Sequence, residues 1–321
     1  MRLGDYCGLY LRDIARQNVG IWVLDGDLAD SDGAVHFAES YPDRFTLAGA
    51  AEQCMVSMAA GLASCGYRPW VFSFASFLCY RAYDQIRVCV SQARQPVTLV
   101  GSHSGGCGGR NGKTHLALND ISLMASLPHM QVWAPACSSD VQMAVRTILA
   151  GEEPAYLRLP RMQVADLPGD AAVCRWLLSP QNLNFVSTGL ATQLALEAAR
   201  ALEQHGIASG LLHCARVSPL PRQVRELTAG AEPIVVVEDH YSRGGLASLI
   251  REIATSRVTS IGWPNSWPGK SGSELDVLES QGLGRRGILE RVLVSLRERA
   301  AAWGAPPTNM TCPLHDPRTH S

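Results

Sequence analysis

The sequence predicts an α/β protein with two domains, each a mainly parallel sheet with helices on both faces. Short apolar runs of strand length alternate with longer segments in which apolar residues recur at helical spacing. A proline-containing stretch interrupts this alternation once, and the alternation then resumes. The chain has 321 residues, which is long enough for two domains that each bury a core.

The first half supplies five expected strands and five expected helices. A helix is expected near the start, because Leu9, Leu11 and Ile14 recur at helical spacing. The further helices are expected from Glu52 to a stop at Cys65-Gly66 and over residues 81–93, 116–127 and 140–150. The strands are expected at residues 21–24, 69–74, 96–100, 130–133 and 155–159. Repeated strand–helix units of this kind imply a parallel sheet covered on both faces.

The second half repeats the pattern after a linker at residues 166–183, around Pro168, Gly169 and Pro180. Strands are expected at residues 184–188, 211–213 and 234–237, and helices at 192–205 and 286–302. The predicted domains are therefore residues 1–165 and 184–303. The proline-containing segment 304–321 is expected to be a mobile tail.

Composition excludes several classes of protein. The net charge is -1, so neither a nucleic-acid partner nor a membrane surface is expected. The charges of Arg2, Asp5, Arg12 and Asp13 argue against a signal peptide, and no apolar run has membrane-spanning length. The ten cysteines are scattered without a CxxC pair. They indicate small core residues in a reducing cytoplasm rather than disulfides or a metal site.

The run from Leu47 to Met55 contains a single carboxylate, Glu52, among small and apolar residues. Burial there would favour the protonated form, so Glu52 would be able to share a proton. The alternative is a glutamate at a helix start, where the helix dipole stabilises negative charge. The residues alone leave both interpretations open.

Aromatic residues gather after the strand at 69–74, and Phe74, Phe77 and Tyr80 are spaced by three. Such a cluster is most often core. The alternative is that these rings form a flat slot for a planar heteroaromatic ring.

Two histidines, His103 and His115, flank a glycine-rich loop that follows the strand at 96–100. Ligands of open parallel sheets bind beyond the carboxyl ends of strands, so both are candidate site residues. The loop is neither a dinucleotide fingerprint nor a phosphate-binding P-loop. Cys107 within it is a weaker candidate for a nucleophile.

Taken together, these motifs resemble the pyrimidine-binding domain of transketolases. They are, in order, Ala51-Glu52-Gln53, Phe74-Ala75-Ser76-Phe77, Arg81-Ala82-Tyr83-Asp84-Gln85-Ile86-Arg87, His103 and Gly112-Lys113-Thr114-His115. Residues 184–300 resemble the C-terminal domain of the same family, with Glu238-Asp239-His240 and Gly244-Gly245-Leu246 in the expected place.

The resemblance implies an enzyme that uses thiamine diphosphate to move a two-carbon glycolyl unit from a ketose to an aldehyde. In the family the residue at Glu52 hydrogen-bonds a pyrimidine nitrogen of the cofactor, and the cofactor stabilises the carbanion. Phe77 would stack on the pyrimidine, and Phe74 and Tyr80 would complete the slot. The implied catalytic residues are Glu52, His103 and His115.

The same resemblance implies the substrate contacts. His103 and His115 would contact substrate oxygens, and Ser31 and Arg161 fall where the family binds the sugar phosphate. Arg2 is a looser third candidate. The usual Glu-Asp before the loop glycine is Arg110-Asn111 here, and Leu116 replaces a Gln after the histidine. Asn111 would therefore contact the substrate where an aspartate normally recognises the α-hydroxyl of the sugar. This departure favours a donor or acceptor that is more anionic, or less hydroxylated near the reacting carbon, than ordinary ketose phosphates.

The family's Gly-Asp-Gly…Asn motif, which holds Mg²⁺ and the diphosphate, is absent from this sequence. The resemblance therefore implies the C-terminal subunit of a split transketolase in an α2β2 complex. A separate N-terminal subunit would supply the Mg²⁺ and diphosphate ligands. The alternatives are a relative that uses a pyruvate-like donor, as deoxyxylulose-phosphate synthase or a 2-oxo acid dehydrogenase β-subunit does, and a non-catalytic partner subunit.

Overall fold

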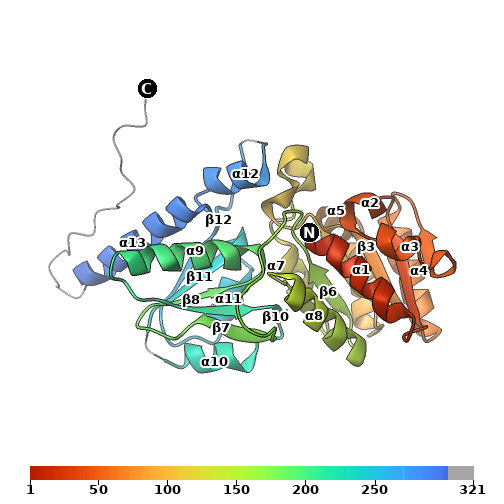
Figure 1. Cartoon of the computed structure of the whole chain (residues 1–321), viewed down its shortest axis with the longest axis horizontal. Coiled ribbons are helices and arrows are strands. Elements are labelled where there is room, and N and C mark those ends of the chain that lie inside the picture. The colour runs from red at the N-terminus through yellow and green to blue at the C-terminus, as the bar shows by residue number, and fades with distance from the viewer. Residues whose placement is uncertain (231, 270, 303–321) are drawn as a thin grey trace.

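A computed structural model describes residues 1–230, 232–269 and 271–302. Two sheets with covering helices lie side by side along the long axis of the molecule (Figure 1). The predicted α/β class is confirmed. The segment 304–321, expected to be a mobile tail, lies outside the described residues.

The first domain contains a seven-stranded sheet in the order β10-β5-β6-β4-β3-β1-β2. All of its pairings are parallel except that of β10 with β5. Its strands are β1 (Ile21–Asp25), β2 (Phe45–Leu47), β3 (Arg68–Phe74), β4 (Thr98–Ser102), β5 (Gln131–Trp133), β6 (Ala155–Arg158) and β10 (Arg216–Ser218).

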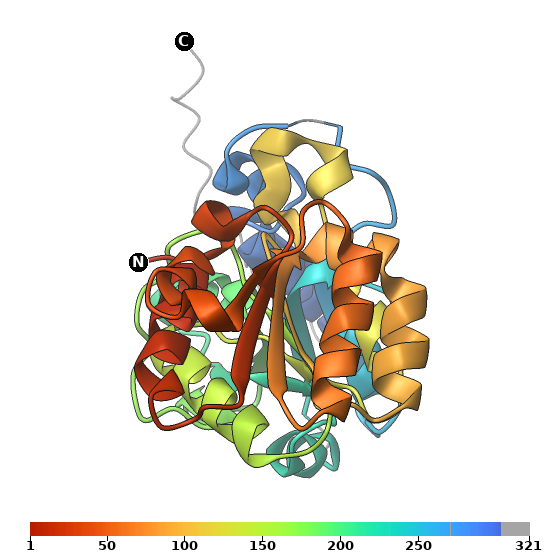
Figure 2. The same cartoon turned by 90° about the vertical axis from the view of Figure 1, so that its right-hand side faces the viewer.

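Helices cover both faces of this sheet (Figure 2). The α-helices are α1 (Leu3–Ala15), α2 (Ala29–Asp32), α3 (Val35–Ala38), α4 (Glu52–Ser64), α5 (Ala75–Arg81), α6 (Tyr83–Gln85), α7 (Asp120–Ala125) and α8 (Ser138–Ala150). Shorter helical turns are η1 (Pro42–Arg44), the π-helix η2 (Ile86–Gln92), η3 (Gly106–Asn111) and η4 (Lys113–His115). One core packs α1 and α8 against the sheet, around Leu11, Trp70 and Val145. The core on the other face packs α4 and η2 around Met55 and Ile86.

The second domain contains a five-stranded sheet in the order β12-β11-β8-β9-β7, in which only β7 runs antiparallel to its neighbour. The strands are β7 (Cys174–Leu178), β8 (Asn184–Ser187), β9 (Gly210–Cys214), β11 (Ile234–Tyr241) and β12 (Val258–Trp263). The helices are α9 (Leu190–Gln204), α10 (Arg222–Thr228), α11 (Leu246–Arg251), α12 (Glu274–Ser280) and α13 (Arg285–Ala302).

The connection between the domains differs from the sequence expectation. The segment 166–183, expected to be a linker, contributes β7, which pairs with β9 from Cys174 opposite Cys214. The second half also returns β10 to the first sheet, where Arg216 pairs with Trp133. The two domains are therefore linked by the pairing of β10 with β5 as well as by the chain that passes from one domain to the other.

Two expected helices have different bounds. The segment 81–93 is interrupted at Ala82, whose backbone has φ -107° and ψ 14°, and continues as α6 and the π-helix η2. The helix expected from Leu116 begins only at Asp120. Ala117 instead pairs with Gly105, and the carbonyl of Leu118 accepts a hydrogen bond from the amide of Tyr241.

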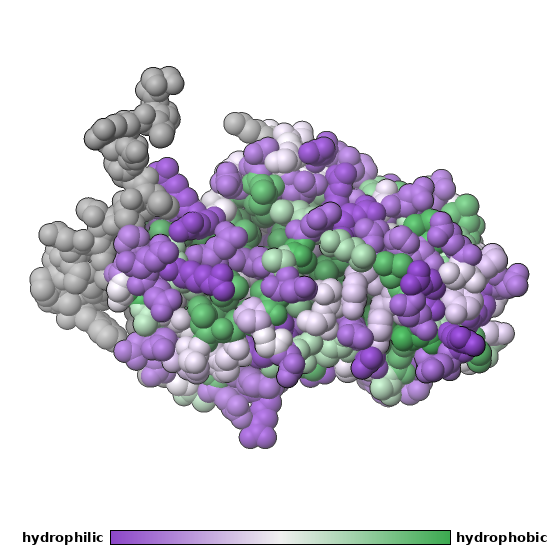
Figure 3. Space-filling model, viewed as in Figure 1, coloured by the Kyte–Doolittle hydropathy of each residue, from purple (hydrophilic) through white to green (hydrophobic). Residues whose placement is uncertain are grey.

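Six cysteines are buried as expected: Cys7, Cys79, Cys107, Cys137, Cys174 and Cys214. The expectation is wrong for Cys54 and Cys65, which are exposed on α4 and directly after it. No helix in the described part of the chain is long and apolar enough to cross a membrane. On the face seen in Figure 3, polar and small apolar areas are interspersed rather than gathered into one patch.

Candidate functional site

The candidate residues of the first domain meet at the carboxyl ends of adjacent parallel strands. Phe74 ends β3, and Phe77 follows on α5. His103 follows β4, which pairs with β3 along its whole length. Glu52 begins α4, shortly after the edge strand β2. This edge of the sheet is where open α/β proteins bind their ligands.

Glu52 is a buried carboxylate with only 2% of its surface exposed. Arg81 at the end of α5 donates from Nη1 to both Glu52 oxygens at 3.2 Å, and the Ser73 hydroxyl donates to Oε1 at 3.3 Å. Of the two interpretations that the sequence leaves open, the structure shows both a buried Glu52 and a helix start. The sequence does not predict the pairing with Arg81, which depends on where α5 ends.

Four rings form one aromatic cluster beside Glu52. The ring centroids of Phe74 and Phe77 are 5.5 Å apart with near-parallel planes. His103 lies 3.9 Å from Phe74, and His115 lies 5.2 Å from Phe77 at a steep angle. The structure therefore brings Phe74 and Phe77, two members of the predicted aromatic slot, together with both candidate histidines.

Both histidines are held in the neutral form at neutral pH. Burial, helped by the charges of Arg161 and Arg2, lowers the pKa of His103 to about 3. Burial and the charge of Arg81 lower the pKa of His115 as well. Ser102 Oγ lies 3.2 Å from Nδ1 of His103, and Thr114 Oγ1 lies 2.9 Å from Nδ1 of His115. Each imidazole is thus fixed on one nitrogen by a neighbouring hydroxyl.

Tyr80 lies apart from the ring cluster. Its hydroxyl donates to Oδ1 of Asn119 at 2.5 Å, next to the start of α7, and its side chain is partly exposed. The structure shows no ring contact between Tyr80 and Phe74 or Phe77.

Arg2 lies near His103 and contacts both Ser31 and the segment that follows β6. Arg2 donates to the carbonyl of Ser31 at 3.0 Å, and its backbone bridges to Gln163. Arg2 also forms a bidentate pair with Asp5, and Arg161 pairs with Glu274 of α12 at 3.3 Å. Both cations are near enough to lower the pKa of His103. They make this side of the site suitable for an anionic group.

The second domain fixes the glycine-rich loop between the histidines. The amide of Gly106 donates to Asp239 at 3.1 Å, and the Trp263 indole donates to the same carboxylate at 2.6 Å. Gly105 has φ +63°, and a Cβ there would overlap the Asp239 carboxylate. These contacts show that Asp239 anchors the loop. The sequence places Asp239 in the Glu238-Asp239-His240 motif but does not predict this role.

Cys107 in the same loop is a buried thiol. Burial, and secondarily the Asp239 charge, raises the pKa of Cys107 to about 12. A thiol in this state is protonated at neutral pH, which does not suit a nucleophile.

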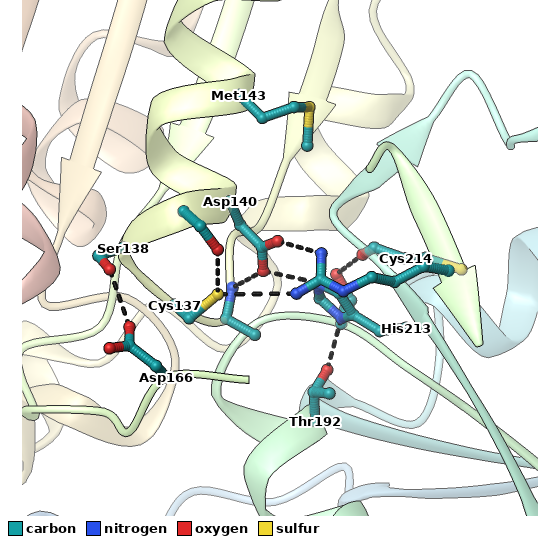
Figure 4. A network of polar contacts seen from close by, with 12 residues as sticks. Cys137, Ser138, Asp140, Met143, Asp166, Thr192, His213 and Cys214 are labelled. Carbon is teal, nitrogen blue, oxygen red and sulfur yellow. Dashed lines mark hydrogen bonds and ion pairs between the residues drawn. The ribbon is translucent and has the colours of Figure 1, made fainter. Parts of the chain in front are cut away.

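A second buried polar cluster joins the domains away from the ring cluster (Figure 4). Asp140 in the first turn of α8 accepts from His213 Nε2 of β9 at 2.9 Å and from Arg175 of β7. Thr192 of α9 lies 2.8 Å from Nδ1 of the same histidine. Burial by itself raises the pKa of Asp140, but the hydrogen bonds and charges of His213 and Arg175 outweigh it and hold that pKa well below its ordinary value.

Other features are weaker candidates for the site. A cavity of about 500 Å³ between α12 and α13 is lined by Glu279, Arg285 and Glu290 and contains none of the ring-cluster residues. Within residues 1–302, apart from positions 231 and 270, no three His, Cys, Asp or Glu side chains are placed to hold a metal ion.

Comparison with known proteins gives matches along nearly the whole sequence. The family model of the transketolase pyrimidine-binding domain matches residues 1–166, and that of the transketolase C-terminal domain matches residues 178–313. A protein of Methanocaldococcus jannaschii described as a transketolase C-terminal section is 30% identical over 91% of this chain and 95% of its own length.

Two further relatives differ in how much of them the chain covers. The 1-deoxy-D-xylulose-5-phosphate synthase 1 of Geobacter sulfurreducens is 29% identical over 94% of this chain, which spans only 49% of that enzyme. A solved structure described as a split gene transketolase, inactive beta4 tetramer, superposes with a TM-score of 0.80 at 30% identity. That match covers 92% of this chain and 98% of the other.

Proposed function

This chain belongs to the transketolase family, and from that premise we propose that it is the C-terminal subunit of a two-chain transketolase. The enzyme would transfer a two-carbon ketol unit from a ketose phosphate to an aldehyde acceptor. The observation that carries the proposal is the buried Glu52 carboxylate, which Arg81 links to the face of Phe77, together with two neutral histidines in the same ring cluster.

The residues present fit the pyrimidine half of thiamine diphosphate. Phe77 offers a ring on which a planar heterocycle stacks, and Glu52 offers a carboxylate that accepts a hydrogen bond from a ring nitrogen. When bound, the cofactor supplies carbanion stabilisation. Glu52 would accept that hydrogen bond at a carboxylate oxygen, and its burial would keep water away from it.

The neutral histidines would hold substrate oxygens. A neutral imidazole donates from one nitrogen and accepts at the other, so His103 and His115 suit hydroxyl and carbonyl groups. Arg161 and Arg2, with Ser31 beside them, would hold the anionic end of the substrate.

A second subunit would complete the site. This sequence has no Gly-Asp-Gly…Asn motif for Mg²⁺ and the diphosphate. Two similar proteins, one described as a C-terminal section and the other as an inactive beta4 tetramer of a split gene transketolase, support a separate N-terminal chain. We propose an α2β2 complex in which that chain holds Mg²⁺ and the diphosphate.

A pyruvate-like donor is the second candidate. The match to 1-deoxy-D-xylulose-5-phosphate synthase along 94% of this chain favours it. So does Arg110, which is exposed next to Asn111 at the end of η3 and adds positive charge near His115. A 2-oxo acid carries a carboxylate close to its reacting carbonyl, and a guanidinium suits that group.

Reconstitution with a partner chain that carries the missing motif tests the proposal. Xylulose 5-phosphate and pyruvate are compared as donors with a sugar-phosphate aldehyde as acceptor, in the wild type and in Glu52→Gln. We expect ketol transfer from the ketose, and a loss of at least about 100-fold in Glu52→Gln with unchanged thermal unfolding of the complex. A complex that uses pyruvate but not xylulose 5-phosphate as the donor would favour the second candidate. A Glu52→Gln complex that keeps full activity, or a complex that turns over neither donor, would contradict the proposal.

A further inference from the structure

Arg81 occupies a specific place in the site. Its Cζ lies 3.8 Å from the centroid of the Phe77 ring, which is a stacking distance. Its Nη1 is 3.2 Å from both oxygens of Glu52. A planar cation thus lies over the Phe77 face and hydrogen-bonds the buried carboxylate at the same time.

These are the contacts that the proposed function assigns to the cofactor's pyrimidine ring. A guanidinium and an aminopyrimidine are both flat, both stack on a phenyl ring and both present N–H groups to a carboxylate. The two groups cannot use the same ring face and the same oxygens together. We propose that Arg81 is a displaceable counter-ion, which fills the pyrimidine's place in the unloaded protein and leaves when the cofactor binds; this inference rests on the proposed function.

The environments of the two partners explain why Arg81 is the group that moves. Glu52 is 2% exposed, whereas the Arg81 side chain is 50% exposed. A buried carboxylate without a partner is costly, and the Ser73 hydroxyl at 3.3 Å is its one other hydrogen-bonding partner in the described chain. Arg81 therefore keeps Glu52 paired before loading. A half-exposed arginine regains water when it leaves, so its departure costs little.

The exchange has a measurable consequence for cofactor affinity. Part of the free energy of cofactor binding is used to break the pair of Arg81 with Glu52. Replacing Arg81 by methionine keeps the aliphatic length and removes the competitor. We expect the Arg81→Met complex to bind thiamine diphosphate about three- to tenfold more tightly than the wild-type complex.

Titration calorimetry of the two-chain complex with thiamine diphosphate and Mg²⁺ measures this directly. Arg12→Met is the matched control, because Arg12 also forms an ion pair at a partly exposed position, with Asp13 on α1. Its affinity should equal that of the wild type. Weaker or unchanged binding in Arg81→Met would overturn the displacement. A wild-type complex that binds no cofactor would instead contradict the proposed function itself.

Thermal unfolding provides a second readout that does not depend on affinity. Without cofactor, Arg81→Met should lower the melting temperature, because Glu52 loses its cation. The decrease should disappear in the Glu52→Gln background and also in the wild-type background at saturating cofactor. A decrease that persists at saturation would show that Arg81 stays paired in the loaded protein, and would overturn the inference.

Discussion

Arg110 and Asn111 end the helical turn that precedes His115. Both are exposed at the end of η3, and the exposed Lys113 follows them. Arg81 adds a fourth polar group near the same histidine, where its charge lowers the pKa. The family resemblance predicts an acidic pair at these two positions, whereas this chain has a cation and an amide there. An amide is a weaker acceptor for a sugar hydroxyl than a carboxylate.

The double change Arg110→Glu with Asn111→Asp tests the role of this pair in specificity. We expect it to raise kcat/KM for xylulose 5-phosphate by about tenfold, the value of one charge-assisted hydrogen bond gained in the transition state. Turnover of a 2-oxo acid or another anionic donor should fall in the same protein. Steady-state kinetics of the reconstituted complex with both donors measures the two effects. If the wild type already uses xylulose 5-phosphate efficiently and the double change alters nothing, these residues do not select the donor.

At the scale of elements, α8 connects the two domains through a buried charge. Asp140 receives hydrogen bonds from His213 on β9 and from Arg175 on β7. These partners come from the second domain, while α8 packs on the first sheet. Removing the carboxylate charge would leave the Arg175 guanidinium in a largely buried place without its counter-ion.

Asp140→Asn should therefore destabilise the protein at pH 7 by about 3–5 kcal/mol, as expected when one partner of a buried ion pair is removed. The folded-state pKa of Asp140 is held below its ordinary value, so folding favours the ionised form. This contribution is fully present above the unfolded pKa of about 4 and is lost as the pH falls through the folded value. Urea unfolding at pH 7 and pH 3 should show a large difference between wild type and variant at pH 7 and a smaller one at pH 3.

The control for this experiment is Asp84→Asn, because Asp84 forms an exposed pair with Arg87. It should change stability by less than about 1 kcal/mol at either pH. An Asp140→Asn deficit that is equally large at pH 3 would indicate lost packing rather than a lost charge.

Element prediction succeeded where burial leaves a clear pattern. The apolar runs at residues 21–24, 69–74 and 234–237 are strands because both faces of a parallel sheet are covered. The four edge strands β2, β7, β10 and β12 are not predicted, because strands with largely intermediate exposure carry no such run. The break at Ala82 is not predicted either, since alanine favours a continuous helix.

Site prediction had a similar limit. Strand ends and a family resemblance both point to Glu52, Phe74, Phe77, His103 and His115, and their role in a site stays a prediction. The pairing of Arg81 with Glu52 and that of Asp239 with Gly106 join residues far apart in the sequence. Periodicity and spacing do not report such contacts, so the structure was needed to find them.

At the scale of the whole molecule, we propose that the chain contributes one half of a cofactor site. The pyrimidine side is built from β3, β4 and the start of α4, and the second domain fixes its glycine-rich loop through Asp239. The similarity to a transketolase C-terminal section and to a split gene transketolase supports the central proposal, which is that cofactor binding requires two different polypeptides.

Titration calorimetry with thiamine diphosphate and Mg²⁺, on this chain alone and on the chain mixed with its N-terminal partner, tests that claim most directly. The chain alone should bind with a Kd weaker than about 0.1 mM, because only the pyrimidine contacts are available. The complex should bind at least about 100-fold more tightly, since the partner adds the Mg²⁺ and diphosphate ligands. Micromolar or tighter binding by the chain alone, with no gain when the partner is added, would contradict the account.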